Sequence, residues 1–442
     1  MSVSRTAGEA GWHVSRYNLA ARIPDSDKIA VANLYRGICG AYTPAEMFLL
    51  NEVETLDENH PILGRFKERG LIVNFDELEA LSAKGRIACS KSDAVAMTIC
   101  PTMGCNFDCP YCFENHRPGR MSRQIQDDVI ALAGRMLEAS HAQNLEVTWY
   151  GGEPLLMPDI IEALTGRLTA LAERRGVDYG AVIITNGYLL TQQVADMLER
   201  CKVRGAQITL DEIGPEHDRT RHLAGGGPTY DRIEQNLRTL RLPFKVVIRH
   251  NVHEGNRDQI APLSARVRDV AEESGNDITY YASPLQGNTV SDGRGSEVNM
   301  LLSENLCEVD MRRDVEEFHS GRGVYCGAQH LFSVGIDDHG RLFKCWEDVD
   351  KPERSFGRAD CWDPARPILS AESPDQLIQY LNLGVPLDDA ECRDCVFLPQ
   401  CEGGCPTRRI YYKKACAGGK DAPERFVLGL YERLQKEKQA QG

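Results

Sequence analysis

Four cysteines are concentrated in the stretch CPTMGCNFDCPYCF, residues 100–113, and the last three of them have a spacing that could do chemistry. Cys105, Cys109 and Cys112 follow the spacing C-x3-C-x2-C. Three thiolates on one short loop can bind three corners of a [4Fe–4S] cluster, whereas an ordinary electron-transfer cluster takes four ligands. The fourth iron would then be open to a substrate or cofactor. A zinc loop or three buried thiols are the alternatives, but zinc usually takes its ligands as two separated pairs. The spacing favours the cluster.

Composition narrows the class of protein. The chain has 442 residues, a net charge of −14 and 16 cysteines. No apolar run is long enough to span a membrane, and the N-terminus lacks an apolar signal core, so a cytoplasmic protein is expected. The acidic balance argues against a nucleic-acid partner, because phosphate binding needs a basic surface. Disulfides explain so many cysteines poorly in a protein that is not secreted, which favours metal or cluster ligation.

The elements that must position the cysteine loop alternate between strand and helix through residues 91–290. Apolar strands are expected at 95–100, 145–152, 181–187, 206–212, 244–252 and 277–285, with amphipathic helices between them. This pattern predicts an α/β fold, a parallel sheet closed into a partial (β/α)6 TIM-like barrel. Active sites of such barrels lie at the carboxyl ends of the strands. The cysteine loop follows the first strand and is therefore expected on that face.

Two further regions flank the barrel. Residues 1–90 are expected to form a β-hairpin, three helices and a strand, with a capping box at Thr43 and Glu46. This module resembles a winged helix-turn-helix, which can bind DNA or take an extended peptide along a strand edge. Its slightly acidic charge favours the peptide. Residues 291–442 lose the strand–helix rhythm, are loop-rich and cysteine-dense, and end in a helix at 422–437.

The loop, the barrel and the motifs at later strand ends together resemble the radical S-adenosylmethionine (SAM) enzymes. In that family SAM chelates the open iron, and an electron from the cluster cleaves SAM to a 5′-deoxyadenosyl radical that abstracts hydrogen from a substrate. The resemblance implies SAM contacts at strand ends, with Thr209 near the carboxylate that Arg221 would hold. These residues are Tyr111, Gly151, Gly152, Glu153, Pro154, Thr185, Asn186, Thr209, Asp211, Arg221, Arg249 and Asn251.

Each of these motifs has a simpler structural reading. Gly151 to Pro154 could be a plain strand-to-helix turn, and Thr185 with Asn186 a polar turn. Arg221 could be a solvated surface residue, and Arg249 could belong to a buried structural ion pair. Glu212 stands where the family has glycine, which puts the local turn in doubt.

The later cysteines resemble the seven-cysteine pattern of SPASM domains, which hold two auxiliary [4Fe–4S] clusters. With the loop cluster this implies three clusters. A pair of zinc sites is the alternative. The inner of the two auxiliary clusters would have only three of these cysteines. Cys361 and Cys307 are candidates for its fourth ligand, and the remaining iron could also be open to substrate. Cys39, Cys89 and Cys201 are expected to be ordinary thiols. The outer cluster would take Cys392, Cys395, Cys401 and Cys416, and the inner cluster Cys326, Cys345 and Cys405.

SPASM enzymes mostly act on peptides or proteins. We expect a maturase of a ribosomal precursor peptide, bound through its leader by residues 1–90, that forms a thioether, C–C or C–O crosslink. Its electron donor would be a flavodoxin or a ferredoxin. A formylglycine-forming sulfatase maturase is the runner-up, but Trp346 stands where that family has an Asp base. Glu347 and Asp348 are candidate bases, with solvated loop carboxylates as the alternative. A redox-sensing DNA-binding regulator is the hypothesis from another class.

Overall fold

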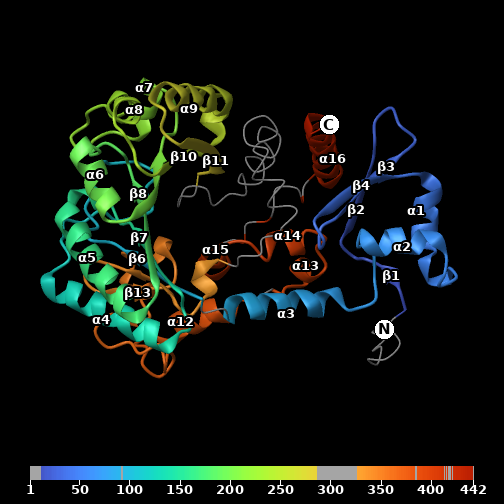
Figure 1. Ribbon diagram of the computed structural model, residues 1–442, viewed down its shortest axis with the longest axis horizontal. Coiled ribbons are helices and arrows are strands. Elements are labelled where there is room, and N and C mark those ends of the chain that lie inside the picture. Colours follow the sequence, from blue (N-terminus) through green and yellow to red (C-terminus); the bar gives the residue numbers. More distant parts are fainter. Residues whose placement is uncertain are drawn as a thin grey trace.

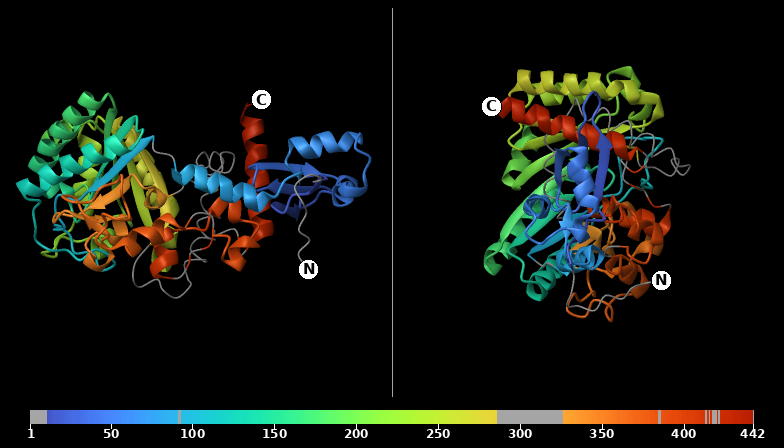
Figure 2. Two further views of the ribbon diagram at one scale, coloured as in Figure 1. Left: turned by 90° about the horizontal axis from the view of Figure 1, so that it is seen from below. Right: turned by 90° about the vertical axis from the view of Figure 1, so that its right-hand side faces the viewer.

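The computed structural model describes residues 11–90, 93–285, 326–383, 386–412, 414, 416, 420 and 422–441. A large sheet with its helices forms one body, and a small N-terminal module forms another (Figure 1). Helix α3, Glu77–Ser90, runs from the module to the first strand of the large sheet. Figure 2 shows the same separation from two other directions.

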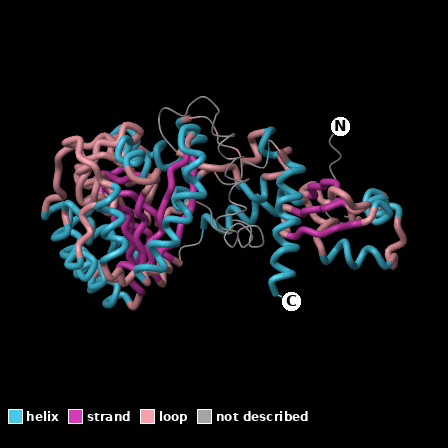
Figure 3. The backbone as a smooth tube through the Cα atoms, turned by 90° about the horizontal axis from the view of Figure 1, so that it is seen from above, coloured by secondary structure: helices cyan, strands magenta, loops and turns pink. Residues whose placement is uncertain are grey.

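The six predicted barrel strands are present and pair in chain order, all parallel to one another. Their apolar side chains alternate between the two faces of the sheet, and one face packs against the connecting helices. Figure 3 shows these strands side by side with helices along the outer face. The strands are β6 Ala94–Ile99, β7 Asn144–Trp149, β8 Asp178–Thr185, β9 Val203–Thr209, β10 Lys245–Val252 and β11 Ile278–Pro284.

The connecting helices begin and end where local chemistry predicts. Ser122 caps α4 by accepting a hydrogen bond from the Ile125 amide, and Gly176 ends α5 in a left-handed conformation with φ of 69°. Their apolar stripes fill the core beneath the sheet. The helices are α4 Arg123–Ala139, α5 Pro158–Arg175, α6 Gln192–Arg200, α7 Pro215–Thr220, α8 Tyr230–Thr239 and α9 Ile260–Ser274.

The C-terminal region adds strands to the barrel sheet, which the sequence analysis did not anticipate. β12, Ser333–Ile336, pairs in parallel with β6, and β13, Arg341–Phe343, returns antiparallel beside it, followed by β14, Gly357–Arg358. The large sheet therefore has nine strands in the described residues. These strands have only two to four residues, so pairing with β6 and with one another rather than intrinsic preference defines them.

The N-terminal module contains the expected hairpin, β2 Asn18–Arg22 with β3 Ile29–Asn33, and a third strand, β4 Ile38–Tyr42, that was not expected. The predicted capping box at Thr43 and Glu46 is present at the start of α1, Pro44–Asn51. The module also contains helix α2 and a second sheet, which has two strands, β1 and β5. The bounds are β1 His13–Val14, β5 Ile72–Val73 and α2 Pro61–Glu68.

The C-terminal helix packs against the N-terminal module. Helix α16, Pro423–Gln441, packs against β2, β3 and β4, and its Val427 and Leu430 are buried there with Tyr17 and Leu34 (Figure 1). Short helices precede it: α12 Pro374–Leu381, α13 Ala390–Arg393, α14 Leu398–Cys401 and α15 Pro406–Tyr411. Among the described residues, no helix is both long and apolar enough to cross a membrane.

Candidate active site

The cysteine loop lies at the carboxyl end of β6, as predicted, and rests on the glycine turn that follows β7. The Gly152 amide donates to the Thr102 carbonyl at 3.3 Å, and the Glu153 amide donates to the Gly104 carbonyl at 2.9 Å. A Cβ on Gly151 would come within 2.3 Å of the Thr102 oxygen, and one on Gly152 within 2.4 Å of the Gly104 oxygen. Only glycines allow the loop to approach so closely.

The three loop thiols lie near one another. Burial raises the pKa of Cys105 to about 12, and the thiols of Cys109 and Cys112 raise it further. Burial also raises the pKa of Cys112 to about 12, and a backbone N–H from Phe107 points at Cys105 Sγ from 3.4 Å. Such thiols stay protonated unless a cation such as iron replaces the proton. The donor set therefore fits a metal cluster better than a free nucleophile.

The arrangement of the cysteine thiols differs from a binding site for a single metal ion such as zinc. Among the described residues, no three His, Cys, Asp or Glu side chains converge closely enough to hold a single metal ion. A four-iron cluster distributes its ligand sulfurs over separate irons, so its thiols stand further apart than those around one zinc ion.

Glu153 joins the ends of β7 and β8. Its carboxylate is fully buried and accepts hydrogen bonds from the Leu155 amide at 2.9 Å, the Thr185 hydroxyl at 2.8 Å and the Asn186 amide at 2.8 Å. Asn186 in turn donates to the Asn106 side chain at 2.8 Å. The structure thus brings the predicted residues Glu153, Thr185 and Asn186 together. Their hydrogen-bond network reaches the cysteine loop at Asn106.

A buried polar group links the loop to the fourth barrel strand. The Tyr111 hydroxyl donates to Asp211, and Arg221 Nη1 donates to the same hydroxyl at 2.7 Å. Burial raises the pKa of Asp211, and Arg221 and Tyr111 lower it. Arg221 is buried, not a solvated surface residue, and its guanidinium lies 5.8 Å from the Phe107 ring centre. The chain segment after Arg221 also pairs with the loop, through the Phe107–Leu223 bridge.

Arg249 and Asn251 share one face of β10, as their spacing predicts. Arg249 Nε donates to Asn251 Oδ1 at 2.9 Å, and Arg249 pairs in register with Thr209 of β9 and Tyr281 of β11. Within the described residues, no carboxylate ion pair is recorded for Arg249, so the structure does not show the buried ion pair that was considered as the alternative.

The C-terminal cysteines form two sets. The pKa of Cys401 is raised by burial and also by Cys395, Cys392 and Cys416, which places these four thiols together. Gly403 N donates to Cys401 Sγ, and Arg409 to Cys392 Sγ, each at 3.4 Å. Donors to sulfur are typical of cluster ligands.

The second set is Cys326, Cys345 and Cys405. Cys326 raises the pKa of both other thiols, after the larger effect of burial. Cys361 is not part of this set: it is exposed, and its charged neighbours are Asp360, Glu372 and Arg358. Cys307 lies outside the described residues.

Glu347 and Asp348 are not solvated loop carboxylates, the alternative that the sequence allowed. Asp348 is fully buried, lies 2.8 Å from Arg354 in an ion pair and accepts a hydrogen bond from the Tyr380 hydroxyl. Glu347 is nearly buried, and burial raises the pKa of its carboxyl although Arg408 and Lys351 lower it. Packing of α12 and α15 around this turn, which sequence periodicity does not reveal, buries both side chains.

Sequence reasoning missed a polar and aromatic group beside the loop. Glu114, two residues after Cys112, is buried, which raises the pKa of its carboxyl to about 7, and Tyr150 hydrogen-bonds to it. The Trp346 ring lies 5.8 Å from the Tyr150 ring and is 47% exposed. The position of Tyr150 directly before Gly151 was the one available signal for this group.

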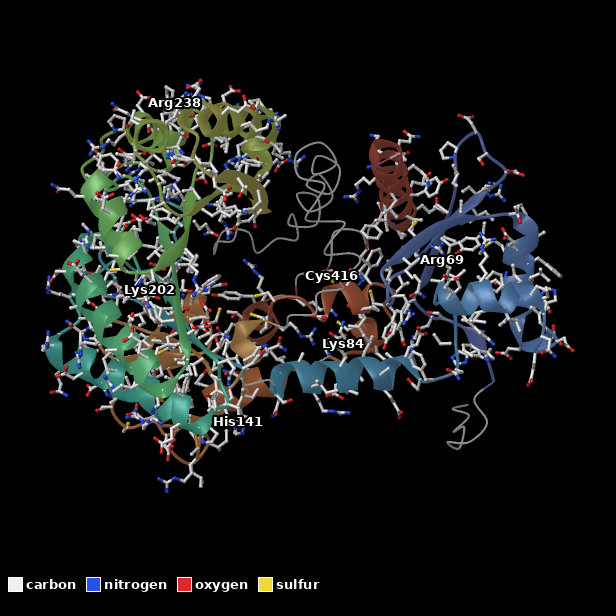
Figure 4. All side chains as sticks on the ribbon, in the orientation of Figure 1. Arg69, Lys84, His141, Lys202, Arg238 and Cys416 are labelled. Atoms are coloured by element: carbon white, nitrogen blue, oxygen red, sulfur yellow. The ribbon has the colours of Figure 1, made fainter. Side chains whose placement is uncertain are left out.

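A cavity of about 670 Å³ lies at the opposite, amino end of the strands. Tyr179, Lys202, Arg204, Lys245 and Asp277 help to line it, and none of the predicted site residues does. Lys202 marks this end in Figure 4. The polar networks and the thiols, rather than this cavity, define the candidate active site.

Comparison with known proteins agrees with this geometry. Residues 99–261 match the family described as "Radical SAM superfamily". These residues begin at the end of β6 and include the cysteine loop, the glycine turn and Arg221. The match identifies residues 99–261, the region of the barrel and the cysteine loop, as similar to radical SAM domains.

Two curated relatives match over part of their length. One is an AdoMet-dependent heme synthase of Methanosarcina barkeri, 26% identical over 51% of this chain and 60% of the relative. Another is the radical SAM cyclopropyl synthase TigE of Paramaledivibacter caminithermalis, 24% identical over 58% of this chain and 53% of the relative. The chain thus spans a little over half the length of each.

A solved structure of native anSMEcpe with bound AdoMet and the Kp18Cys peptide superimposes with a TM-score of 0.57. It is 16% identical and covers 78% of this chain and 99% of its own. This likeness confirms the α/β fold with a mostly parallel central sheet.

Proposed function

We propose that this enzyme is a peptide maturase that uses SAM and three [4Fe–4S] clusters to crosslink a ribosomal precursor peptide. The observation that carries the proposal is the grouping of ten cysteines into three sets, one at the SAM-type turn and two in the C-terminal region. The bond would be a thioether or a C–C or C–O link. The name of the TigE relative, a cyclopropyl synthase, supports the carbon–carbon option.

Cys105, Cys109 and Cys112 would hold the first cluster and leave one iron for SAM. When bound, the cluster and SAM supply a 5′-deoxyadenosyl radical. The chain's own residues position SAM: the turn at Gly151 and Gly152 brings backbone groups to the loop. Arg221 supplies a buried positive charge suited to a carboxylate. The remaining predicted contacts line the same strand ends: Tyr111, Glu153, Pro154, Thr185, Asn186, Thr209, Asp211, Arg249 and Asn251.

The C-terminal sets would hold the auxiliary clusters of a SPASM domain. Cys392, Cys395, Cys401 and Cys416 supply four ligands, and Cys326, Cys345 and Cys405 supply three. A crosslink requires the substrate to lose two hydrogens, and an auxiliary cluster would accept the electron that remains after the first abstraction. The chain's contribution is to hold these sulfurs near one another, with N–H donors at Cys401 and Cys392.

Glu347 is the better candidate base of the two acidic residues. Asp348 is committed to Arg354 and Tyr380, whereas Glu347 acts electrostatically on Cys405 and lies beside the exposed Trp346. Burial raises the pKa of Glu347, which brings a carboxyl closer to the range useful for proton transfer.

The N-terminal module would bind the leader of the precursor peptide. Its three-stranded sheet has β2 and β4 as edge strands, and an edge strand can pair with an extended peptide. The superimposed anSMEcpe structure holds a peptide, which supports a peptide substrate. Free thiols and clusters fit a reducing cytoplasm, where a flavodoxin or ferredoxin would donate electrons.

The test uses anaerobic enzyme with reconstituted clusters, SAM, dithionite and candidate precursor peptides encoded beside the gene. Mass spectrometry should show a product lighter by the mass of two hydrogen atoms, formed only with the leader present. A product in which a cysteine has lost its sulfur and gained an aldehyde would instead identify a formylglycine-forming enzyme. If SAM is cleaved but none of these candidate peptides is modified, the maturase proposal is contradicted.

A further inference from the structure

In the part of the chain that the structure describes, the inner set of cysteines has three members so far assigned. Cys326, Cys345 and Cys405 lie together, but an electron-transfer [4Fe–4S] cluster takes four protein ligands. Cys361 is exposed and faces Asp360, Glu372 and Arg358. Cys361 is therefore not positioned to complete this set of ligands.

The pairing of β6 with β12 brings two distant cysteines to one edge of the sheet. Ala96 pairs in parallel register with Ser333, and the Ala96 amide donates to the Phe332 carbonyl at 2.9 Å. Cys89 lies seven residues before Ala96, and Cys326 lies seven residues before Ser333. Because the strands are parallel, both preceding segments approach the amino edge of the same strand pair.

Cys326 and Cys345 both lie close to Ser333 at this edge. A Cβ on Gly327 would come within 3.1 Å of the Ser333 hydroxyl, so the residue after Cys326 packs on the start of β12. In the antiparallel pair of β12 and β13, Gly335 opposes Phe343. Because the pair is antiparallel, Cys345, two residues after Phe343, comes opposite Ser333, two residues before Gly335. Lys344 Nζ also donates to the Ser333 carbonyl at 2.5 Å.

Helix α3 packs along the C-terminal segment that carries Cys392 and Cys405. Leu81 is buried in one cluster with Cys392, Phe397 and Leu398. One turn further, Lys84 Nζ lies 3.8 Å from Glu402 Oε1, three residues before Cys405. Lys84 is labelled on α3 in Figure 4, and Figure 1 shows the helix running on toward the barrel. The last turn of α3 therefore approaches Cys405 and Cys326.

Cys89 lies on this last turn and is only half-buried. Gly85, one turn earlier on the same face, is buried. Burial raises the pKa of Cys89, and Glu402 and Cys326 raise it further. The packing of α3 on the C-terminal segment and the pairing of β6 with β12 thus bring Cys89 and Cys326 to the same edge of the sheet.

We propose that Cys89 is the fourth ligand of the inner auxiliary cluster, completing the set of Cys326, Cys345 and Cys405. The inference rests on the proposed function, in which these three cysteines hold that cluster. Ligation is a proton exchange: the Cys89 thiol releases its proton to solvent as the sulfur–iron bond forms, and no atom changes oxidation state. The cluster would then fasten α3, the helix between the N-terminal module and the barrel, to the C-terminal region.

The test compares Cys89→Ala and Cys89→Ser with wild-type enzyme, with Cys326→Ala as the positive reference and exposed Cys361→Ala as the matched control. Clusters are reconstituted anaerobically, and iron content, electron paramagnetic resonance spectra and reduction potentials are measured without substrate. Cys89→Ala should lose about one to four irons per chain and change the inner-cluster signal. Cys89→Ser, which keeps an oxygen ligand, should retain more iron with a shifted potential. Cys361→Ala should match wild type.

Folding is controlled by far-ultraviolet circular dichroism, and alanine is well tolerated in a helix. If Cys326→Ala changes the iron content and spectra but both Cys89 variants match wild type, the ligand assignment is overturned while the proposed function stands. If the Cys326 and Cys89 variants all match wild type, the inner cluster itself is absent, and the proposed three-cluster enzyme fails with it.

Discussion

Arg221 Nη1 donates a hydrogen bond to the Tyr111 hydroxyl at 2.7 Å, joining the end of α7 to the loop that carries Cys105, Cys109 and Cys112. The Tyr111 hydroxyl in turn donates to Asp211 at the end of β9. One guanidinium thus balances a buried carboxylate and fixes the loop at the same time. The relationship links the cysteine loop to the chain segment after β9 and to the end of α7.

Arg221→Ala should destabilise the protein by about 3–5 kcal/mol, because it leaves Asp211 buried without a positive partner. SAM binding should weaken in parallel, since the loop loses its attachment. Chemical denaturation and equilibrium binding of SAM measure the two effects. Arg219 on the same helix forms an exposed ion pair with Glu216, and Arg219→Ala should cost no more than about 1 kcal/mol. Equal effects of the two substitutions would contradict the assigned role of Arg221.

Gly152→Ala should displace the cysteine loop, because the added Cβ would lie 2.4 Å from the Gly104 carbonyl oxygen. A displacement of about 1 Å at a reacting centre can lower a rate about 100-fold, and we expect a loss of that order in SAM cleavage. Gly134→Ala in α4 is the matched control, since a Cβ there meets nothing within 4 Å. Full activity of Gly152→Ala would show that the loop does not depend on the glycine turn.

His250 should make the folded state sensitive to acid. Its side chain is buried beside the Tyr280 hydroxyl at 2.7 Å, and burial followed by His253 lowers its pKa to about 3. In the unfolded chain the imidazole takes a proton below about pH 6.5. The free energy of unfolding should therefore fall as the pH drops from about 6.5 to about 3, by up to about 1.4 kcal/mol per pH unit from this residue.

His250→Gln should reduce that slope, measured by denaturation of the cluster-free protein at several pH values. His141 is exposed near the barrel surface (Figure 4), and His141→Gln should leave the slope unchanged. An unchanged slope in His250→Gln would mean that the buried imidazole is protonated in the folded state.

Trp346→Ala should impair peptide modification without affecting SAM cleavage in the absence of peptide. The ring is half-exposed beside Tyr150, at the residue before the glycine turn, where a substrate side chain could pack against it. Loss of such an aromatic contact typically costs 1 kcal/mol or more, so we expect about a tenfold rise in the KM for peptide. Leu369, 87% exposed, provides the control substitution to Ala. A loss of peptide-independent cleavage would instead indicate a structural role.

Local patterns were sufficient to predict the barrel and the cysteine loop. The alternation in strands β6 to β11 and the spacing of Cys105, Cys109 and Cys112 are contained in short segments. Strand β12 was missed because its pairing with the distant strand β6 defines it, and β13 and β14 extend the sheet from β12; the short strand β4 pairs with β3 directly before it and was missed as well. The burial of Asp348 and Glu114 was missed because residues distant in the chain lie against them: Tyr380 of α12 against Asp348, and Tyr150 and Asp350 against Glu114.

The most direct test of the central claim is SAM cleavage by anaerobic, reconstituted enzyme with dithionite, followed as formation of 5′-deoxyadenosine. The account predicts steady formation by wild type and by Cys361→Ala, whose thiol is exposed and away from both C-terminal sets. Cys105→Ala, Cys109→Ala and Cys112→Ala should each abolish it, because each removes one of the three ligands of the cluster that binds SAM. Retained 5′-deoxyadenosine formation in any of these three variants would contradict the account.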